Sequence, residues 1–394
     1  MKLLPIPDDG IPDWKALRDA FDWVEALHHC PQDPIWHAEG DVGIHTEMVL
    51  RALVEAPGWA ALGEFDRAVT WLACLLHDVS KPETTVTEHD GRITARGHSR
   101  RGAVVARRIL WRLDVPFAVR EAVCALIAVH QVPFFAIEGD GFEDRLKLGS
   151  QVVRNDLLAR VAEADIRGRT CDDMQRLLDN IELFRLACAE QGCLDRPYVH
   201  ASAHARFLHA AAGRAPVGVA PHEDFACTAA LMCGLPGSGK DTWLRDHFGG
   251  WPVVTLDGIR ARLGVAPGDH DGRVIQAARE AAREHLRAGR DFAWNGTHLS
   301  ARRRGQLVEL FAGYRARVRV VYVEASAREQ ARRNRARAAA VPKDVIARML
   351  DSWEVPQPAE GHAVEWVASD GSALAADGLP GGAPWVRAPG AAIE

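Results

Sequence analysis

The chain has 394 residues, of which 47% are hydrophobic and 26% are charged, and its formal net charge is −5. This length exceeds one ordinary hydrophobic core, so we expect two globular domains. The negative net charge argues against sequence-independent binding to a long nucleic acid duplex. We see neither an apolar run of about 18 residues nor a signal peptide, and therefore expect a cytoplasmic protein with no membrane partner. The eight cysteines form no CxxC pair, which is typical of buried, reduced thiols.

The first two hundred residues show the apolar spacing of helices. Predicted helices cover Asp66–Leu76, Ser99–Leu113, Val119–Val129, Gln151–Glu163 and Asp172–Gln191. Two short β-prone runs at residues 85–87 and 92–94 flank Asp90-Gly91 and predict a hairpin. We therefore expect an all-α first domain over residues 1–212.

Small residues, proline and glycine dominate Ala210–Asp224, so residues 213–226 are the predicted linker. Beyond it, strands alternate with helices, which favours an α/β domain at 227–370 with a parallel sheet covered on both faces. Predicted strands are Cys227–Cys233, Pro252–Leu256, Asp291–Trp294, Val318–Glu324 and Ala363–Ala368. Residues 371–394 are expected to form a loosely ordered tail.

Metal-ligating side chains recur in order through the first domain, each on or near a predicted helix. They are His45, His77, Asp78, His98, His130 and Asp165. Any one histidine is more simply a hydrogen-bonded core or surface residue, but the ordered set indicates one or two divalent transition metal ions. Lys81, one turn after His77-Asp78, is placed to bind a phosphate oxygen. Glu39 and Asp41 precede His45, so either could touch the site, but for both we favour a polar loop or helix cap.

A glycine-rich segment lies between a predicted strand and a predicted helix, as a phosphate-binding P-loop requires. It comprises Gly234, Leu235, Pro236, Gly237, Ser238, Gly239, Lys240, Asp241 and Thr242. Lys240 would contact the β and γ phosphates of ATP, with Mg²⁺ alongside. A hydroxyl residue usually follows the lysine, so Asp241 is either a magnesium-associated carboxylate or only a complement to the helix dipole.

Two further features of the second domain suit phosphoryl transfer. Asp257 follows the second strand, where a carboxylate can accept a proton from an attacking hydroxyl, and Arg260 can hold an acceptor phosphate. Arg333 and Arg337 are four residues apart, which on a helix gives one face for a lid over the triphosphate. A solvated basic helix is the plainer alternative for that pair.

Residues 227–370 resemble the 5′-hydroxyl polynucleotide kinase family in the glycine loop, in Asp257-xx-Arg260 and in the Arg333-Asn334-Arg335-Ala336-Arg337 segment. The resemblance implies that Asp257 is the general base for a 5′-hydroxyl, Arg260 binds the neighbouring acceptor phosphate, and arginines of the lid contact ATP. Which of Arg332, Arg333 and Arg337 does so stays open.

Residues 25–200 resemble the HD phosphohydrolase superfamily, through His77-Asp78-x-x-Lys81 and the further histidines. By that resemblance His45, His77, Asp78 and Asp165 hold a first metal, and His98 and His130 hold a second, with Asp78 bridging.

The combination resembles bacterial HD–polynucleotide kinase end-healing enzymes. It implies removal of 2′,3′-cyclic, 2′- or 3′-phosphate and phosphorylation of 5′-hydroxyl ends of RNA or DNA, with a separate ligase to seal them. Two alternatives stay open: a small-molecule or nucleoside kinase fused to an HD nucleotidase, and an ATP-gated signalling phosphodiesterase.

Overall fold

A computed structural model describes residues 6–135, 140–211, 219–266, 271–337, 339–368, 373–375 and 383–386. Contacts between residues divide the chain into two compact units. One comprises Met1–Tyr198 with Trp385–Glu394, and the other comprises Val199–Pro384. The predicted architecture, a helical domain followed by an α/β domain, is confirmed.

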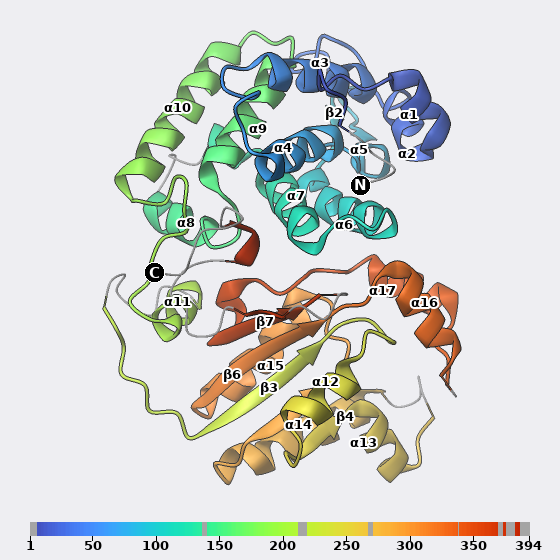
Figure 1. Cartoon of the computed structure of the whole chain (residues 1–394), viewed down its shortest axis with the longest axis vertical. Helices are drawn as coiled ribbons and strands as arrows, with labels where there is room; N and C mark the ends of the chain where they lie inside the picture. Colours follow the sequence, from blue (N-terminus) through green and yellow to red (C-terminus); the bar gives the residue numbers. More distant parts are fainter. Residues whose placement is uncertain are drawn as a thin grey trace. The chain divides into compact units, whose positions relative to one another are not determined.

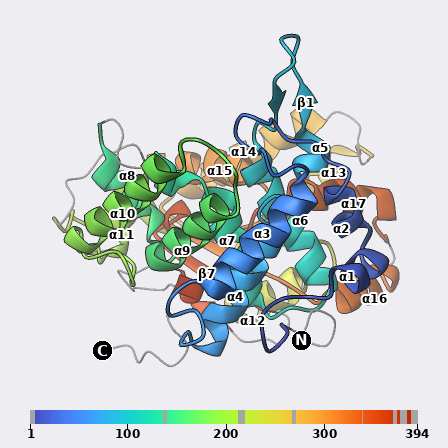
Figure 2. The same ribbon diagram turned by 90° about the horizontal axis from the view of Figure 1, so that it is seen from above.

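The first unit is built from helices and one small hairpin (Figure 1). Its elements are α1 (Trp14–Ala20), α2 (Asp22–Leu27), α3 (Val42–Glu55), α4 (Glu64–Leu76), α5 (Lys81–Thr84), β1 (Val86–Thr87), β2 (Ile93–Thr94), α6 (His98–Arg112), α7 (Phe117–Val129), the 3₁₀ turn η1 (Val132–Phe134), α8 (Phe142–Gly149), α9 (Asn155–Arg167) and α10 (Met174–Glu190). The predicted hairpin is present, and β1 and β2 pair antiparallel. Figure 2 shows the hairpin projecting from the helices of this unit.

The five predicted helices correspond to α4, α6, α7, α9 and α10. Helix α9 begins at Asn155, four residues after the predicted start, because residues 151–152 form a turn. The apolar periodicity that predicted α4 reflects a helix buried from Ala68 to Leu76. Asp41 caps α3 by accepting a hydrogen bond from the Ile44 amide at 2.9 Å, as its sequence position suggested.

One stretch, Phe117–Phe134, is long and apolar enough to cross a membrane by length and composition alone. The expectation that no apolar run reaches 18 residues is therefore wrong at this place. The stretch is 61% buried inside the protein, and core helices pass the same test, so it is weak evidence for a membrane span. A cytoplasmic location stays a prediction.

In the described part of the second unit, six strands form one sheet in the order β4-β5-β3-β6-β7-β8. Its elements are α11 (Ala203–Ala210), β3 (Cys227–Cys233), α12 (Lys240–His247), β4 (Val253–Thr255), α13 (Leu256–Leu263), α14 (Asp271–Arg287), β5 (Phe292–Asn295), α15 (Ala301–Gly313), β6 (Ala316–Val323), α16 (Ala327–Arg335), α17 (Lys343–Leu350), the 3₁₀ turn η2 (Pro358–Glu360), β7 (Ala363–Val367) and β8 (Ala373–Ala375). Strands β3 to β7 are parallel, as predicted, and β8 pairs antiparallel with β7.

Helices cover both faces of this sheet, which explains why the central strand β3 is buried at six of its seven positions (Figure 1). On one face Ala293 of β5 shares a core cluster with Leu244 and Phe248 at α12. On the other face Phe292 packs against Phe311 of α15 and stacks on a histidine of α14. Because successive side chains of a strand point to opposite faces of the sheet, β5 packs against the helices on both faces.

The C-terminal residues correct one prediction. A loosely ordered tail was expected after residue 370, yet β8 lies in the sheet and η3 (Pro384–Val386) follows it. Trp385 donates a hydrogen bond to the Val152 carbonyl at 2.9 Å and packs edge-on against Phe117. A large buried indole and a strand pairing outweigh the glycine-rich composition around them. Residues 213–218 of the predicted linker lie outside the described residues, and residues 219–226 contain neither helix nor strand.

Candidate functional site

Five helices of the first unit bring the predicted metal ligands together. His45 lies on α3, His77 ends α4 and Asp78 follows it, His98 begins α6, His130 ends α7, and Asp165 lies on α9. All six residues are buried. Their placement at helix ends follows from the sequence, but the convergence requires the folded bundle.

Short distances join these side chains into one cluster. His45 Nε2 lies 3.3 Å from His77 Nε2 and 3.2 Å from Asp165 Oδ1. Asp78 is central, because its two oxygens lie 3.2 Å from His77 Nε2 and 3.4 Å from His98 Nε2. Ligand atoms of Asp78, His98 and His130 all lie within 4.8 Å of one another. The geometry gives Asp78 a position between the two sets of ligands.

Backbone carbonyls orient three of the histidines. The Nδ1 atoms of His77, His98 and His130 are hydrogen-bonded to carbonyls three residues earlier, at 2.7 to 2.8 Å. Each bond fixes the proton on Nδ1 and leaves Nε2 as the free ligand atom. This pattern is the usual support of a metal-binding imidazole.

The cluster also has the unsatisfied atoms and the charge states that a metal requires. Asp78 Oδ1 and His130 Nε2 are buried and have no hydrogen-bond partner among the described residues. Burial lowers the pKa of His130 to about 3, and it lowers that of His98 as well, so both rings are neutral at pH 7. Burial alone would raise the pKa of Asp78, but the charge of Lys81 and the histidines outweigh it and keep this carboxyl ionised. Neutral rings at His98 and His130 and an ionised Asp78 fit a divalent cation. Burial would lower the pKa of His77, but the charge of Asp78 outweighs it and raises that pKa, so a metal at His77 Nε2 would have to displace a proton.

Two cations of the protein stand beside the cluster. Lys81 Nζ lies 2.7 Å from Asp78 Oδ2, and Arg169 makes a two-pronged pair with Asp165. Both line a pocket of about 210 Å³, together with His37 and His98. The predicted phosphate role of Lys81 stays a prediction, and Arg169 is a second cation that no sequence motif singled out.

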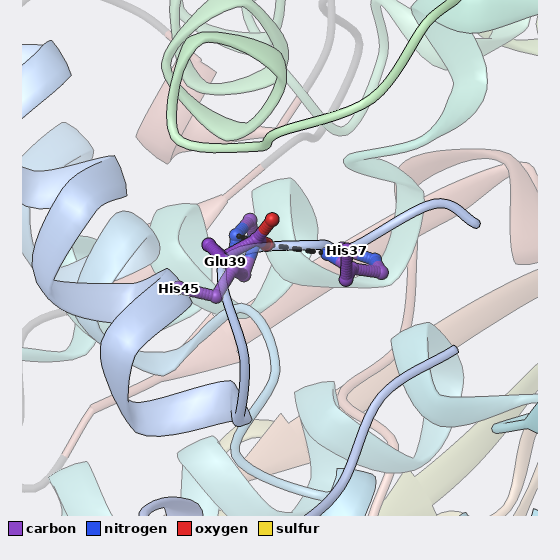
Figure 3. A group of neighbouring side chains, drawn as sticks. All are labelled: His37, Glu39 and His45. Atoms are coloured by element: carbon purple, nitrogen blue, oxygen red, sulfur yellow. Dashed lines mark hydrogen bonds and ion pairs between the residues drawn. The ribbon is translucent and has the colours of Figure 1, made fainter. Parts of the chain in front are cut away.

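Glu39 is a residue whose position corrects the sequence interpretation, which favoured a loop or cap. Its Oε1 accepts hydrogen bonds from His37 Nδ1 at 2.8 Å and from His45 Nδ1 at 3.1 Å (Figure 3). Its Oε2 accepts one from the Thr170 amide at 2.8 Å. Burial would raise the pKa of Glu39, but these hydrogen bonds outweigh it and the pKa is lowered. The polar run at residues 37–41, just before His45, was the available signal.

The second unit carries the P-loop between β3 and α12. Gly234, Gly237 and Gly239 have positive φ angles, which glycine adopts at little cost. A Cβ on Gly234 would lie 2.2 Å from the Val323 carbonyl oxygen, so only glycine fits there. Lys240 Nζ donates to the carbonyls of Gly234 and Leu235 at 2.9 Å. Burial lowers the Lys240 pKa to about 8, a cost that a bound anion would relieve.

A pocket of about 760 Å³ opens over this loop, and both predicted lid arginines line it. Their predicted placement on one helical face is wrong, however, because α16 ends at Arg335 and Arg337 follows it. Arg333 Nη1 donates to the Ser238 carbonyl at 3.2 Å, and Arg333 also pairs with Glu329. Arg332 pairs with the same glutamate and does not line the pocket.

The strand register places the predicted acceptor residues at the same edge of the sheet as the P-loop, although neither Asp257 nor Arg260 lines the pocket over that loop. Thr255 of β4, Asn295 of β5 and Met232 of β3 form one row across the sheet. Asp257 and Gly234 each follow two residues after this row. Strands β4 and β3 are separated by β5, so two inter-strand spacings of about 4.8 Å put them about 10 Å apart. Asp257 is 89% exposed and pairs with Arg260 at 3.0 Å, so its carboxylate is open to a substrate.

Asp241 has a partner that the sequence did not suggest. Its Oδ1 accepts a hydrogen bond from Asn295 Nδ2 at 2.6 Å, at the end of the neighbouring strand. The carboxylate lines the pocket over the P-loop and its second oxygen is left for another ligand. The arrangement is compatible with a magnesium-associated role and does more than complement the helix dipole.

Comparisons with known proteins agree with two phosphate-handling modules. Residues 42–173 match the HD domain family, and residues 230–356 match the AAA domain family. The chain therefore joins an HD domain, a phosphohydrolase class, to a kinase-like P-loop domain. The metal-ligand cluster lies within the first match and the glycine loop within the second.

Three relatives each named "Multifunctional CCA protein" share part of the sequence. The protein from Psychromonas ingrahamii is 32% identical over 30% of this chain and 26% of its own length. Those from Tolumonas auensis and Xanthomonas campestris pv. campestris are 28% and 30% identical, over 40% and 45% of this chain and 37% and 42% of their own lengths. The chain spans less than half of these relatives, so the likeness is partial.

Proposed function

We propose that the protein heals the ends of broken RNA or DNA strands. The HD domain would remove a 2′,3′-cyclic, 2′- or 3′-phosphate with one or two divalent metals, and the P-loop domain would transfer phosphate from ATP and Mg²⁺ to a 5′-hydroxyl. The observation that carries the proposal is the exposed Asp257 carboxylate paired with the largely buried Arg260, after a strand that β5 separates from the P-loop strand. It suits an acceptor that presents a hydroxyl next to a phosphodiester, which a polynucleotide end does.

In the kinase half the proposed roles follow the geometry. Lys240 and the loop amides hold the donor phosphates, and Arg333 and Arg337 neutralise charge that develops in transfer. Asp257 takes the proton of the attacking hydroxyl, and Arg260 orients Asp257 and the acceptor phosphate.

In the phosphoesterase half, His45, His77, Asp78 and Asp165 would hold one metal, and His98 and His130 a second. A bound metal supplies a hydroxide nucleophile at neutral pH. Lys81 and Arg169 would hold the substrate phosphate, and Glu39 would keep His45 in its ligating tautomer.

Two substitutions test the proposal with crossed readouts. Asp257→Ala should abolish transfer of label from γ-labelled ATP to a 5′-hydroxyl oligonucleotide and leave phosphate release from a 3′-phosphate oligonucleotide intact. Asp78→Ala should give the reverse. Phosphorylation of nucleosides but not of oligonucleotides would favour the small-molecule kinase. Full activity of Asp257→Ala in both assays would favour an ATP-gated phosphodiesterase.

A further inference from the structure

The pocket beside the metal cluster has two features that phosphate removal alone does not need. Gln32 and Trp36 line it, on the segment that precedes the first metal ligand. At about 210 Å³ it is smaller than the ~300–1,000 Å³ typical of small-molecule sites. It therefore has room for a phosphate and a sugar, and anything larger must lie at its rim.

Gln32 lines this pocket and carries a buried donor. Its Oε1 accepts a hydrogen bond from Lys81 Nζ at 2.7 Å, which fixes the amide orientation because a lysine can only donate. Its Nε2 is buried and has no hydrogen-bond partner among the described residues, and the residue is only 8% exposed. A buried amide donor without a partner is costly, and an oxygen of a bound substrate would satisfy it.

Trp36 supplies an aromatic surface at the rim. Its side chain is 51% exposed although it lines the pocket. Asp33 holds the segment in place: its backbone carbonyl accepts from the Trp36 amide at 3.1 Å, and its carboxylate accepts from the amides of Ile35 and Ile93. The indole is thus carried on a backbone that is tied to the hairpin strand β2.

We propose that this pocket is a nucleoside subsite of the phosphoesterase, which deepens and rests on the function proposed above. The terminal phosphate lies at Lys81 and Arg169, the Gln32 amide donates to a sugar or phosphate oxygen, and the terminal base stacks on Trp36. A base paired and stacked within a duplex has no free face, so the occupant is the unpaired last nucleotide of a single strand.

The experiment compares two oligonucleotides of equal length that end in a 3′-phosphate. One ends in a normal nucleotide and the other in an abasic sugar. The wild type should favour the first, and Trp36→Ala should remove this preference by raising KM for the normal end on the order of tenfold. Trp36→Phe should restore most of it, which a merely structural role of the indole would not predict. Leu186→Ala, an exposed apolar residue on α10 outside the pocket, is the matched control and should keep the preference.

A far-UV circular dichroism spectrum and a urea unfolding midpoint equal to those of the wild type show that each variant is folded. An equal KM of wild type for both ends, or an unchanged preference in Trp36→Ala, overturns the subsite and leaves the phosphoesterase standing. If the wild type releases phosphate from neither end, the proposed function fails. In that case, fluorescence anisotropy with a labelled 3′-phosphate oligonucleotide tests the subsite by binding alone. Trp36→Ala should then bind this oligonucleotide about tenfold more weakly than the wild type. Equal affinity of the two proteins refutes the subsite.

Discussion

Replacing Glu39 by glutamine should weaken metal binding in the HD domain without unfolding it. The two carboxylate oxygens of Glu39 accept from three donors, His37 Nδ1, His45 Nδ1 and the Thr170 amide. A glutamine offers an acceptor at one of these two positions and an N–H group at the other. Either the two histidines or the Thr170 amide must then face a donor, so the support of His45 is lost or distorted.

The expected loss can be bounded from the contacts. Loss of such supporting carboxylates typically costs 10- to 100-fold in metal affinity, which corresponds to about 1.4 to 2.8 kcal/mol. His45 Nδ1 also lies 3.2 Å from the Gly168 carbonyl, which remains in the variant. We therefore expect Glu39→Gln to lie near the tenfold end of this range.

Calorimetric titration of the metal-free full chain with Mn²⁺ measures this loss directly. Glu143→Gln, a half-exposed glutamate on α8, is the matched control and should bind as the wild type does. Kinase activity should be equal in all three proteins. An affinity of Glu39→Gln within twofold of the wild type would refute the assignment of Glu39 as the support of His45.

Three further outcomes follow from the second unit. Asp241→Asn keeps an oxygen for Asn295 but loses the charge, so phosphorylation should need severalfold more Mg²⁺; an unchanged Mg²⁺ dependence would contradict a metal role. Gly234→Ala should destabilise this unit by more than about 3 kcal/mol in urea unfolding, because its Cβ overlaps a β6 carbonyl, while phosphate release by the HD domain persists. Burial, with the nearby charges of His204 and Arg317, lowers the pKa of His362 to about 3. The unfolded state therefore binds a proton first as pH falls below 6.5, and about 3 kcal/mol of stability is lost by pH 4.5; the urea midpoint should fall accordingly, and less so in His362→Gln.

The bounds of single strands and the P-loop could be predicted, because neighbouring residues along the chain decide them. Strand β3 has the predicted bounds, since a short apolar run followed by glycines has few other solutions. The P-loop was equally visible, because its backbone conformation requires glycine at fixed spacing. The end of helix α16 at Arg335 could not be predicted, because basic residues continue past it without a local stop signal. The Asn334 side chain bonds to the backbone of Val341 in both directions, a contact seven residues away.

The sequence by itself determined which chemistries the chain carries, since His77-Asp78 and the glycine loop each predict a phosphate site from their own residue types and spacing. Only the tertiary structure decided which other side chains join them. Glu39 joins His45 to the Thr170 amide, Gln32 reaches Lys81 across 49 residues, and Asn295 reaches Asp241 across 54 residues. Such contacts depend on how helices and strands pack, and packing is set by the burial of apolar faces over the whole domain. Polar partners brought together in this way leave no periodic trace in the sequence.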